Sequence, residues 1–309
     1  MPIVILSDFA NPEPWINALK KAAPDLEVMV FNKSLDRSQV EFALAWNHPP
    51  GIFMTFPNLK TISSMGAGVD HLLKDQNIPA QANIVRIIDP LLSQDMYEFA
   101  LAVIMNRMKN LTHFRENQQQ KIWKKKRYQR MADVRVGLMG TGIIGNHVAE
   151  NLAKVGFSVS GWSRTAGSSK AYPKFSGESQ LSEFLGSCDF LICLLPLTAE
   201  TRGILNKNTM GMLPVGAWVV NLGRGPLLVD EDLISLLNSG HLAGANLDVF
   251  HQEPLPADHP FWLHPKVYIT PHIASLTDPE SVVPQIIENY RRTINNQPLL
   301  NQVDREKGY

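Results

Sequence analysis

The 309-residue sequence contains only two cysteines and no excess of either charge. Cys188 and Cys193 lie in or beside the apolar run 190–195, so we expect buried thiols rather than a disulfide. Lys and Arg together number 29, and so do Asp and Glu. No overall field would therefore attract nucleic acid or an anionic membrane, and the composition favours a small-molecule partner.

Long hydrophobic runs are missing as well. No stretch approaches the roughly 18 apolar residues that a membrane-spanning helix needs. The first residues, MPIVILSDFA, have no basic segment, and their apolar run is too short for a signal peptide. We therefore expect a cytoplasmic protein. Its length suits two domains, and a hydrophobic content of 44% can fill two cores.

Short apolar runs alternate with longer helical patterns, which is typical of parallel sheets covered by helices on both faces. The expected strands of the first third are 3–7, 27–31, 42–46, 61–65 and 84–88. Those of the second part are 134–139, 157–162, 190–195, 217–222, 243–249 and 267–270. Helical patterns cover 91–114 and 279–294, and the pattern alone allows either domain to own the last helix.

Residues 116–130, ENQQQKIWKKKRYQR, are polar and basic without apolar periodicity. We interpret this segment as a solvated connector. The alternative is a phosphate-binding patch, but Trp123 and Tyr128 are the only aromatic residues that could support one.

Gly140, Gly142 and Gly145 have the GxGxxG spacing of a dinucleotide-binding loop. An apolar strand precedes them, and the helical pattern that follows places Ile144, Val148, Leu152 and Val155 on one face. In such a loop the first glycine makes a tight turn, the second lets the backbone approach a pyrophosphate, and the third lets helix pack on strand. The N-terminus of the helix then receives the phosphates.

The next strand ends at Ser163, Arg164 and Thr165, and no acidic residue occurs between Glu150 and Glu178. A site that prefers NAD usually places Asp or Glu about 20 residues after the glycines, to bind the ribose 2′-hydroxyl. Two hydroxyls and a guanidinium suit a 2′-phosphate instead. We expect NADP(H) to be preferred and NAD(H) to be possible. The alternative is that Arg164 is a solvated surface residue and the cofactor is NAD.

Polar groups follow three successive strands near the end of the chain: Arg224, then Asp248 and Glu253, then His272. Ligands of open parallel sheets bind outside the carboxyl ends of the strands, so these groups should meet at the cofactor cleft. Arg224 could anchor a substrate carboxylate, and His272 could act as general acid. Glu253 would stabilise the imidazolium and hold its ring. Asp248 would support the arginine or the cofactor.

Substrate contacts are expected from GAGVD and from Trp46. Gly66 and Gly68, on either side of Ala67, expose backbone N–H groups where a helix begins, and such groups suit a carboxylate. Arg224 would hold the same carboxylate from the other side. A simple tight turn is the alternative. Trp46 ends a strand and could wall the pocket, although a buried core tryptophan would look the same. A bulky indole in the pocket would favour a small substrate.

The glycine loop, GRG at 223–225, Glu-Pro at 253–254 and Pro-His at 271–272 together resemble the D-isomer-specific 2-hydroxyacid dehydrogenase family over nearly the whole chain. Within the family the sequence is most similar to the glyoxylate/hydroxypyruvate reductase A branch. The segments WNHPP (46–50), GAGVD (66–70), WSRT (162–165) and VDREKGY (303–309) support this. One departure from the family pattern is Gly223, where many relatives have Ala.

The resemblance implies an α/β protein in which a Rossmann cofactor domain, 101–276, is inserted in a flavodoxin-like substrate domain, 1–100 and 277–309. Both would be doubly wound parallel sheets. It also implies D stereochemistry, a homodimer, no metal, and Arg224, Glu253 and His272 as the catalytic set, with Arg224 and His272 also binding substrate beside Trp46, Ala67 and Gly68. The residues assigned to the cofactor are Gly140, Gly142, Ile143, Ile144, Gly145, Ser163, Arg164, Thr165, Leu195, Pro196, Leu222, Gly223, Asp248 and Ala274.

The sequence thus predicts an NADPH-dependent reductase that converts glyoxylate to glycolate and hydroxypyruvate to D-glycerate. One alternative is a dehydrogenase of larger 2-keto acids, such as phenylpyruvate or branched-chain acids. Another is a regulator that senses dinucleotides without turnover, although a sensor has no need of a proton donor.

Overall fold

The computed structural model describes residues 1–7, 11–32 and 34–308. Tyr309, the last residue of the VDREKGY segment, lies outside this part. The chain divides into two units, 1–91 with 277–309 and 92–276. The boundary expected at residue 100 falls inside helix α3 (Pro90–Met108). None of the helices in the described ranges combines the length and the apolar character of a membrane span.

The first unit is built on a five-stranded parallel sheet in the order β2-β1-β3-β4-β5, the flavodoxin-like order. The strands are β1 (Ile3–Ser7), β2 (Val28–Val30), β3 (Phe42–Trp46), β4 (Thr61–Ser64) and β5 (Asn83–Val85), and the helices are α1 (Glu13–Ala22), α2 (Asp70–Leu73) and α9 (Pro279–Ile294). Short 3₁₀ turns cover Arg37–Gln39 and Ile52–Thr55.

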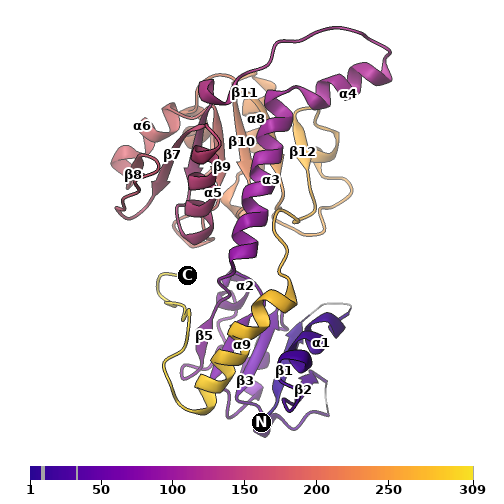
Figure 1. Cartoon of the computed structure of the whole chain (residues 1–309), viewed down its shortest axis with the longest axis vertical. Helices are drawn as coiled ribbons and strands as arrows, with labels where there is room; N and C mark the ends of the chain where they lie inside the picture. The colour runs from indigo at the N-terminus through magenta and orange to yellow at the C-terminus, as the bar shows by residue number, and fades with distance from the viewer. Residues whose placement is uncertain (8–10, 33, 309) are drawn as a thin grey trace. The chain divides into compact units, whose positions relative to one another are not determined.

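Helix α9 returns from the far end of the sequence to pack beside α1 on this sheet (Figure 1). It begins as the sequence predicts, because Asp278 accepts a hydrogen bond from the Glu280 N–H and Pro279 occupies the first helical position. In the interior, the hydroxyl of Thr293 lies 2.8 Å from that of Thr61 in β4. These contacts assign the last helix to the first unit, which makes that unit discontinuous in sequence.

The second unit is built on a seven-stranded parallel sheet in the order β12-β11-β10-β9-β6-β7-β8, which extends the classic Rossmann order by one strand. Its strands are β6 (Arg135–Met139), β7 (Ser158–Ser163), β8 (Lys174–Ser176), β9 (Phe190–Cys193), β10 (Ala217–Asn221), β11 (Leu242–Leu247) and β12 (Val267–Ile269). Its helices after α3 are α4 (Leu111–Gln119), α5 (Ile143–Lys154), α6 (Leu181–Gly186), α7 (Lys207–Gly211) and α8 (Asp230–Asn238). Short 3₁₀ turns cover Met131–Asp133, Glu178–Gln180, Gly225–Leu227 and Pro260–Leu263.

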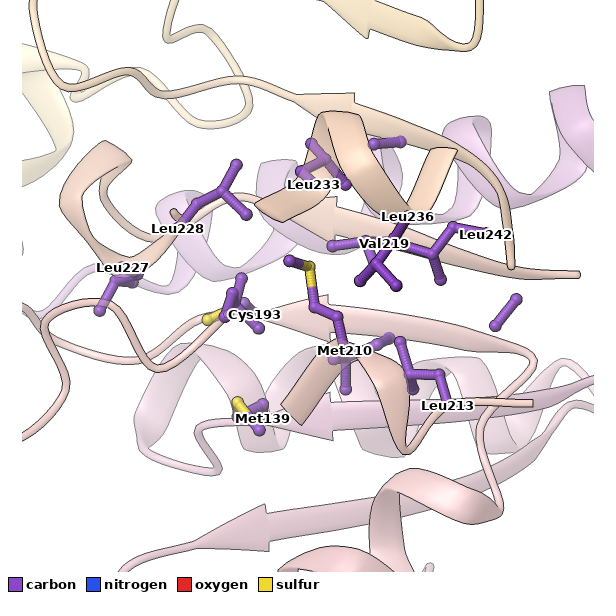
Figure 2. Packing of buried hydrophobic residues seen from close by; sticks show 14 of the residues in the cluster. Met139, Cys193, Met210, Leu213, Val219, Leu227, Leu228, Leu233, Leu236 and Leu242 are labelled. Atoms are coloured by element: carbon purple, nitrogen blue, oxygen red, sulfur yellow. The ribbon is translucent and has the colours of Figure 1, made fainter. Parts of the chain in front are cut away.

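Both faces of this sheet are covered, because alternate residues of its strands enter opposite cores. Val219 of β10 and Cys193 of β9 pack with α7 and α8 (Figure 2). The neighbouring residues Val220 and Ile192 pack on the other face with α3 and α5. The expected class, two doubly wound parallel sheets, is confirmed.

Cys188 and Cys193 are buried free thiols, as expected. Burial raises the pKa of each to about 12. Both groups therefore behave as apolar core residues.

Three sequence expectations are corrected. The pattern over 91–114 is two helices, because Asn110 adopts a left-handed conformation (φ 56°) between α3 and α4 and donates to the Arg127 carbonyl. Helix α4 continues to Gln119, so only residues 120–130 of the basic segment lack helix and strand. Val155, expected on the buried face of α5, caps the helix and is exposed.

Candidate active site

The glycine loop joins β6 to α5 at the point where the strand order reverses, between β6 and β9. Gly140 has φ +106°, and a Cβ there would lie 2.8 Å from the backbone of Leu194. A Cβ on Gly145 would lie 1.9 Å from the Gly140 carbonyl oxygen. These two positions therefore require glycine, as the motif predicts.

Gly142 differs from the other two glycines. A Cβ there would meet no atom of the described residues within 4 Å, so its surface is open. It precedes Ile143 and Ile144 in the first turn of α5, whose N–H groups have no acceptor within the helix. An open glycine beside a helix N-terminus fits the pyrophosphate of a dinucleotide.

Ser163 ends β7, and Arg164 and Thr165 follow it at the same edge of the sheet. Ser163 Oγ donates to the Thr165 carbonyl at 2.8 Å, which closes the turn. The Arg164 guanidinium forms an ion pair with Glu200, from the segment after β9. Arg164 thus pairs with a carboxylate, while 45% of its side chain stays exposed. Leu195 and Pro196 lie in the same segment after β9, and their contact with the cofactor stays a prediction.

The turn after β10 carries Leu222, Gly223 and Arg224. Buried Asn221, which sequence reasoning missed, ties it together: its side chain accepts from the Gly223 N–H at 3.2 Å and donates to the Arg224 carbonyl at 3.0 Å. Arg224 Nη1 donates to the Gly223 carbonyl at 2.8 Å. A Cβ on Gly223 would lie 2.9 Å from the Leu195 carbonyl oxygen, so the packing here suits glycine.

Glu253 and His272 meet directly. His272 Nδ1 lies 2.7 Å from Glu253 Oε2, while Glu253 Oε1 accepts from the Phe250 N–H at 2.9 Å. Burial alone would raise the pKa of Glu253, but these hydrogen bonds and the charges of His272 and Arg224 lower it below its usual value. Because an ionised carboxylate only accepts, Nδ1 carries the proton facing Glu253. The other ring nitrogen, Nε2, is left for substrate chemistry.

His272 has a left-handed backbone (φ 55°), which is uncommon for a residue with a side chain. Buried Asp248, at the end of β11, holds this conformation. Its carboxylate accepts from the Thr270 hydroxyl at 2.5 Å and from the N–H groups of Ile273 and Ala274 at 3.0 and 2.9 Å. Asp248 thus fixes the loop of the histidine, and a contact of Asp248 or Ala274 with the cofactor stays a prediction.

The Arg224 turn and the Glu253 loop touch through Gly225. A Cβ on Gly225 would lie 1.9 Å from the Phe250 carbonyl carbon and 2.4 Å from the His251 nitrogen. The second glycine of GRG therefore lets the Arg224 turn and the segment before Glu253 pack backbone to backbone.

The strands of this sheet are parallel, so their carboxyl ends share one edge. The glycine loop and the segments that carry Arg164, Arg224, Asp248 and His272 all follow these ends, as the sequence predicts.

Trp46, Ala67 and Gly68 belong to the first unit. Trp46 is half-buried and lies against the His71 ring at 4.4 Å and against Gly66, where a Cβ would be 2.7 Å from the indole. Ser64 Oγ donates to the Gly68 carbonyl at 2.8 Å. Helix α2 begins at Asp70, the last residue of GAGVD, and has only four residues, so its dipole is small. A carboxylate site here would depend on the N–H groups of Ala67 and Gly68.

Comparison with known proteins gives a consistent result. Residues 101–274 match the family model for the NAD binding domain of D-isomer specific 2-hydroxyacid dehydrogenase. The whole chain is 33% identical, over 314 aligned positions and the full length of both chains, to the glyoxylate/hydroxypyruvate reductase A of Yersinia enterocolitica.

Two solved structures extend the likeness to three dimensions. A D-isomer specific 2-hydroxyacid dehydrogenase from Xanthobacter autotrophicus Py2, in complex with NADPH and MES, is 38% identical with a TM-score of 0.94, covering 100% of this chain and 99% of the other. The NADPH-dependent glyoxylate/hydroxypyruvate reductase of Sinorhizobium meliloti, in complex with NADP and sulfate, is 34% identical with a TM-score of 0.93 and the same coverage.

Proposed function

Because the chain belongs to the D-isomer specific 2-hydroxyacid dehydrogenase family, a group of NAD(P)-dependent oxidoreductases that act on CH–OH groups, we propose that it reduces glyoxylate and hydroxypyruvate with NADPH. The observation that carries this proposal is the Glu253–His272 pair, 2.7 Å apart, at the same sheet edge as the glycine loop. It supplies a positioned proton donor beside a dinucleotide site.

In the proposed reaction, NADPH when bound supplies the hydride that reduces the keto carbon of the substrate. Arg224 binds the substrate carboxylate and polarises the carbonyl oxygen. His272 gives the Nε2 proton to that oxygen as negative charge develops on it. Glu253 holds Nδ1–H throughout, which keeps the ring oriented. General acid catalysis of this kind contributes roughly 10²–10⁴ in rate.

The preference for NADPH rests on Arg164 and its two hydroxyl neighbours, and the relatives solved with NADPH or NADP support it. The guanidinium would bind the 2′-phosphate. Replacing Arg164 by Ala should raise the KM for NADPH and leave that for NADH nearly unchanged. An unchanged ratio of the two would exclude the contact with the 2′-phosphate.

The size of the substrate is assigned from the half-buried indole of Trp46, with Ala67 and Gly68 binding the carboxylate. The test is to follow oxidation of NADPH and NADH with glyoxylate, hydroxypyruvate, phenylpyruvate and branched-chain 2-keto acids. We expect the highest kcat/KM for the two small acids with NADPH. A marked preference for the bulky acids would make the chain a dehydrogenase of larger substrates, and no turnover of any acid would favour the sensor.

The cellular location of the enzyme and its oligomeric state are part of the same proposal. We propose that the enzyme works in the cytoplasm, where NADPH is supplied, and that it forms the homodimer that the family resemblance implies. Light scattering after size exclusion would show a mass near twice 34.5 kDa. A mass near 34.5 kDa at assay concentration would contradict the dimer.

A further inference from the structure

Asp230, the first residue of α8, lies between two histidines of the loop that carries Glu253. Its Oδ1 is 3.6 Å from His251 Nε2, and its Oδ2 is 3.4 Å from His259 Nε2. Only 19% of the Asp230 side chain is exposed. His251 stands two residues before Glu253 and His259 six residues after it. One carboxylate therefore reaches both sides of the catalytic loop.

The hydrogen-bond partners of the two rings fix which nitrogens carry protons. His259 Nδ1 accepts from the Phe261 N–H at 3.3 Å, so its Nε2 is the protonated nitrogen that faces Asp230. His251 Nε2 lies 2.8 Å from the Leu228 carbonyl oxygen, which only accepts, so this nitrogen is protonated too. Both rings thus present N–H groups to the segment 228–230 even when they are neutral.

The charges around Asp230 oppose one another. The pKa of Asp230 lies above its usual value: burial raises it most and the carboxylate of Glu231 adds to this, whereas the charges of His251 and His259 act to lower it. The two histidines are therefore the groups that favour the ionised, accepting form of this carboxylate.

The backbone of residues 250–251, which includes one of these histidines, also positions Glu253 beside His272. Phe250, next to His251, donates its N–H to Glu253 Oε1, and the backbone of both residues packs on Gly225. A shift of this segment would move the carboxylate that orients His272.

We propose that Asp230 is a positioning residue for the reaction: by binding His251 and His259 it holds the Glu253 loop so that Glu253 meets His272. The inference rests on the proposed function, because Glu253 and His272 are the acid pair of that reaction. Asp230 touches neither of them and acts through the loop.

The test compares Asp230→Ala with Asp232→Ala. Asp232 lies in the same first turn of α8 and accepts from the Lys207 N–H at 2.8 Å, so its loss removes the same charge from the helix N-terminus without touching the loop. Three quantities are measured: kcat with hydroxypyruvate, the Kd for NADPH, and deuterium uptake of the peptide 248–259. The last does not depend on turnover.

We expect Asp230→Ala to lower kcat by roughly ten- to a hundredfold, since small displacements of catalytic groups cost this much. The Kd for NADPH should stay within about twofold, the peptide should take up deuterium faster, and Asp230→Asn, which keeps one accepting oxygen, should recover part of kcat. Asp232→Ala should match the wild type in all three. If Asp230→Ala also matches it in kcat and uptake, the positioning role is wrong.

If Asp230→Ala does not fold, His259→Phe tests the same point, because it removes the donor and leaves α8 intact. It should lower kcat and speed the uptake, and no change in either would overturn the inference. A wild type that turns over no 2-keto acid would refute the proposed function, whereas the uptake difference would still decide whether Asp230 holds the loop.

Discussion

Replacing Gly225 by Ala tests whether the Arg224 turn and the Glu253 loop must pack backbone to backbone. The added Cβ would lie 1.9 Å from the Phe250 carbonyl carbon, a distance that real Cβ atoms do not adopt. Bringing it to about 3.0 Å requires the two segments to separate by roughly 1.1 Å, because the three nearest atoms all belong to the backbone of Phe250 and His251. A displacement of about 1 Å at catalytic groups can cost roughly a hundredfold, or about 2.7 kcal/mol, in kcat/KM.

The assay is steady-state reduction of hydroxypyruvate, with thermal unfolding to separate activity from stability. Gly211→Ala is the matched control, because a Cβ at the end of α7 meets no atom of the described residues within 4 Å. It should keep wild-type kinetics. If Gly225→Ala does so as well, with kcat/KM within about twofold, the close packing of the two segments is not needed for catalysis.

Three further outcomes are expected. Arg224→Ala should raise the KM for the keto acid and lower kcat, by roughly ten- to a hundredfold in kcat/KM, because a charge-assisted hydrogen bond contributes about 1.5–3 kcal/mol; wild-type kinetics would refute its role as anchor. Asp248→Ala leaves the hydroxyl of Thr270 and the N–H groups of Ile273 and Ala274 without their acceptor. It should lower Tm and kcat together, and a change in Tm alone would mean that the loop does not need this carboxylate to hold His272. The pKa of Glu253 is lowered in the folded chain, so the stability that this group contributes is present above its ordinary value of 4.5 and is lost as pH falls below it. The Tm difference between wild type and Glu253→Gln should therefore hold from pH 7 down to the ordinary value of 4.5 and shrink as the pH falls further, and a difference that stays constant below 4.5 would argue against an ionised Glu253.

Much of the fold could be predicted because the sheets are buried on both faces. Strand β3 (Phe42–Trp46) is an uninterrupted apolar run in the sequence. Asp278 and Pro279 mark the start of helix α9, because they are typical capping and first-turn residues. Strand β8 (Lys174–Ser176) was missed, because it is an edge strand of three half-buried residues that forms by pairing with β7. The end of α3 was also missed. Asn110 ends the helical pattern through its left-handed backbone conformation, and a pattern of apolar residues does not reveal backbone conformation.

The positions of candidate site residues could be predicted where a polar side chain comes directly after the end of a strand. The positions of Arg224 after β10 and of His272 after β12 could be predicted in this way, and Glu253 lies against His272. The catalytic roles of the three residues stay predictions. The supporting contacts were not visible. Asn221 looks like the last residue of a strand, and Asp230 like an ordinary acid at a helix N-terminus, because their partners are brought to them only by the fold.

The most direct test of the account is the rate of keto-acid reduction by His272→Gln, measured together with the Kd for NADPH. Glutamine keeps a polar side chain in the loop but cannot donate a proton as an acid. We expect kcat to fall by roughly 10²–10⁴ while the Kd for NADPH stays near that of the wild type. A variant that keeps its kcat would show that the proton comes from another group.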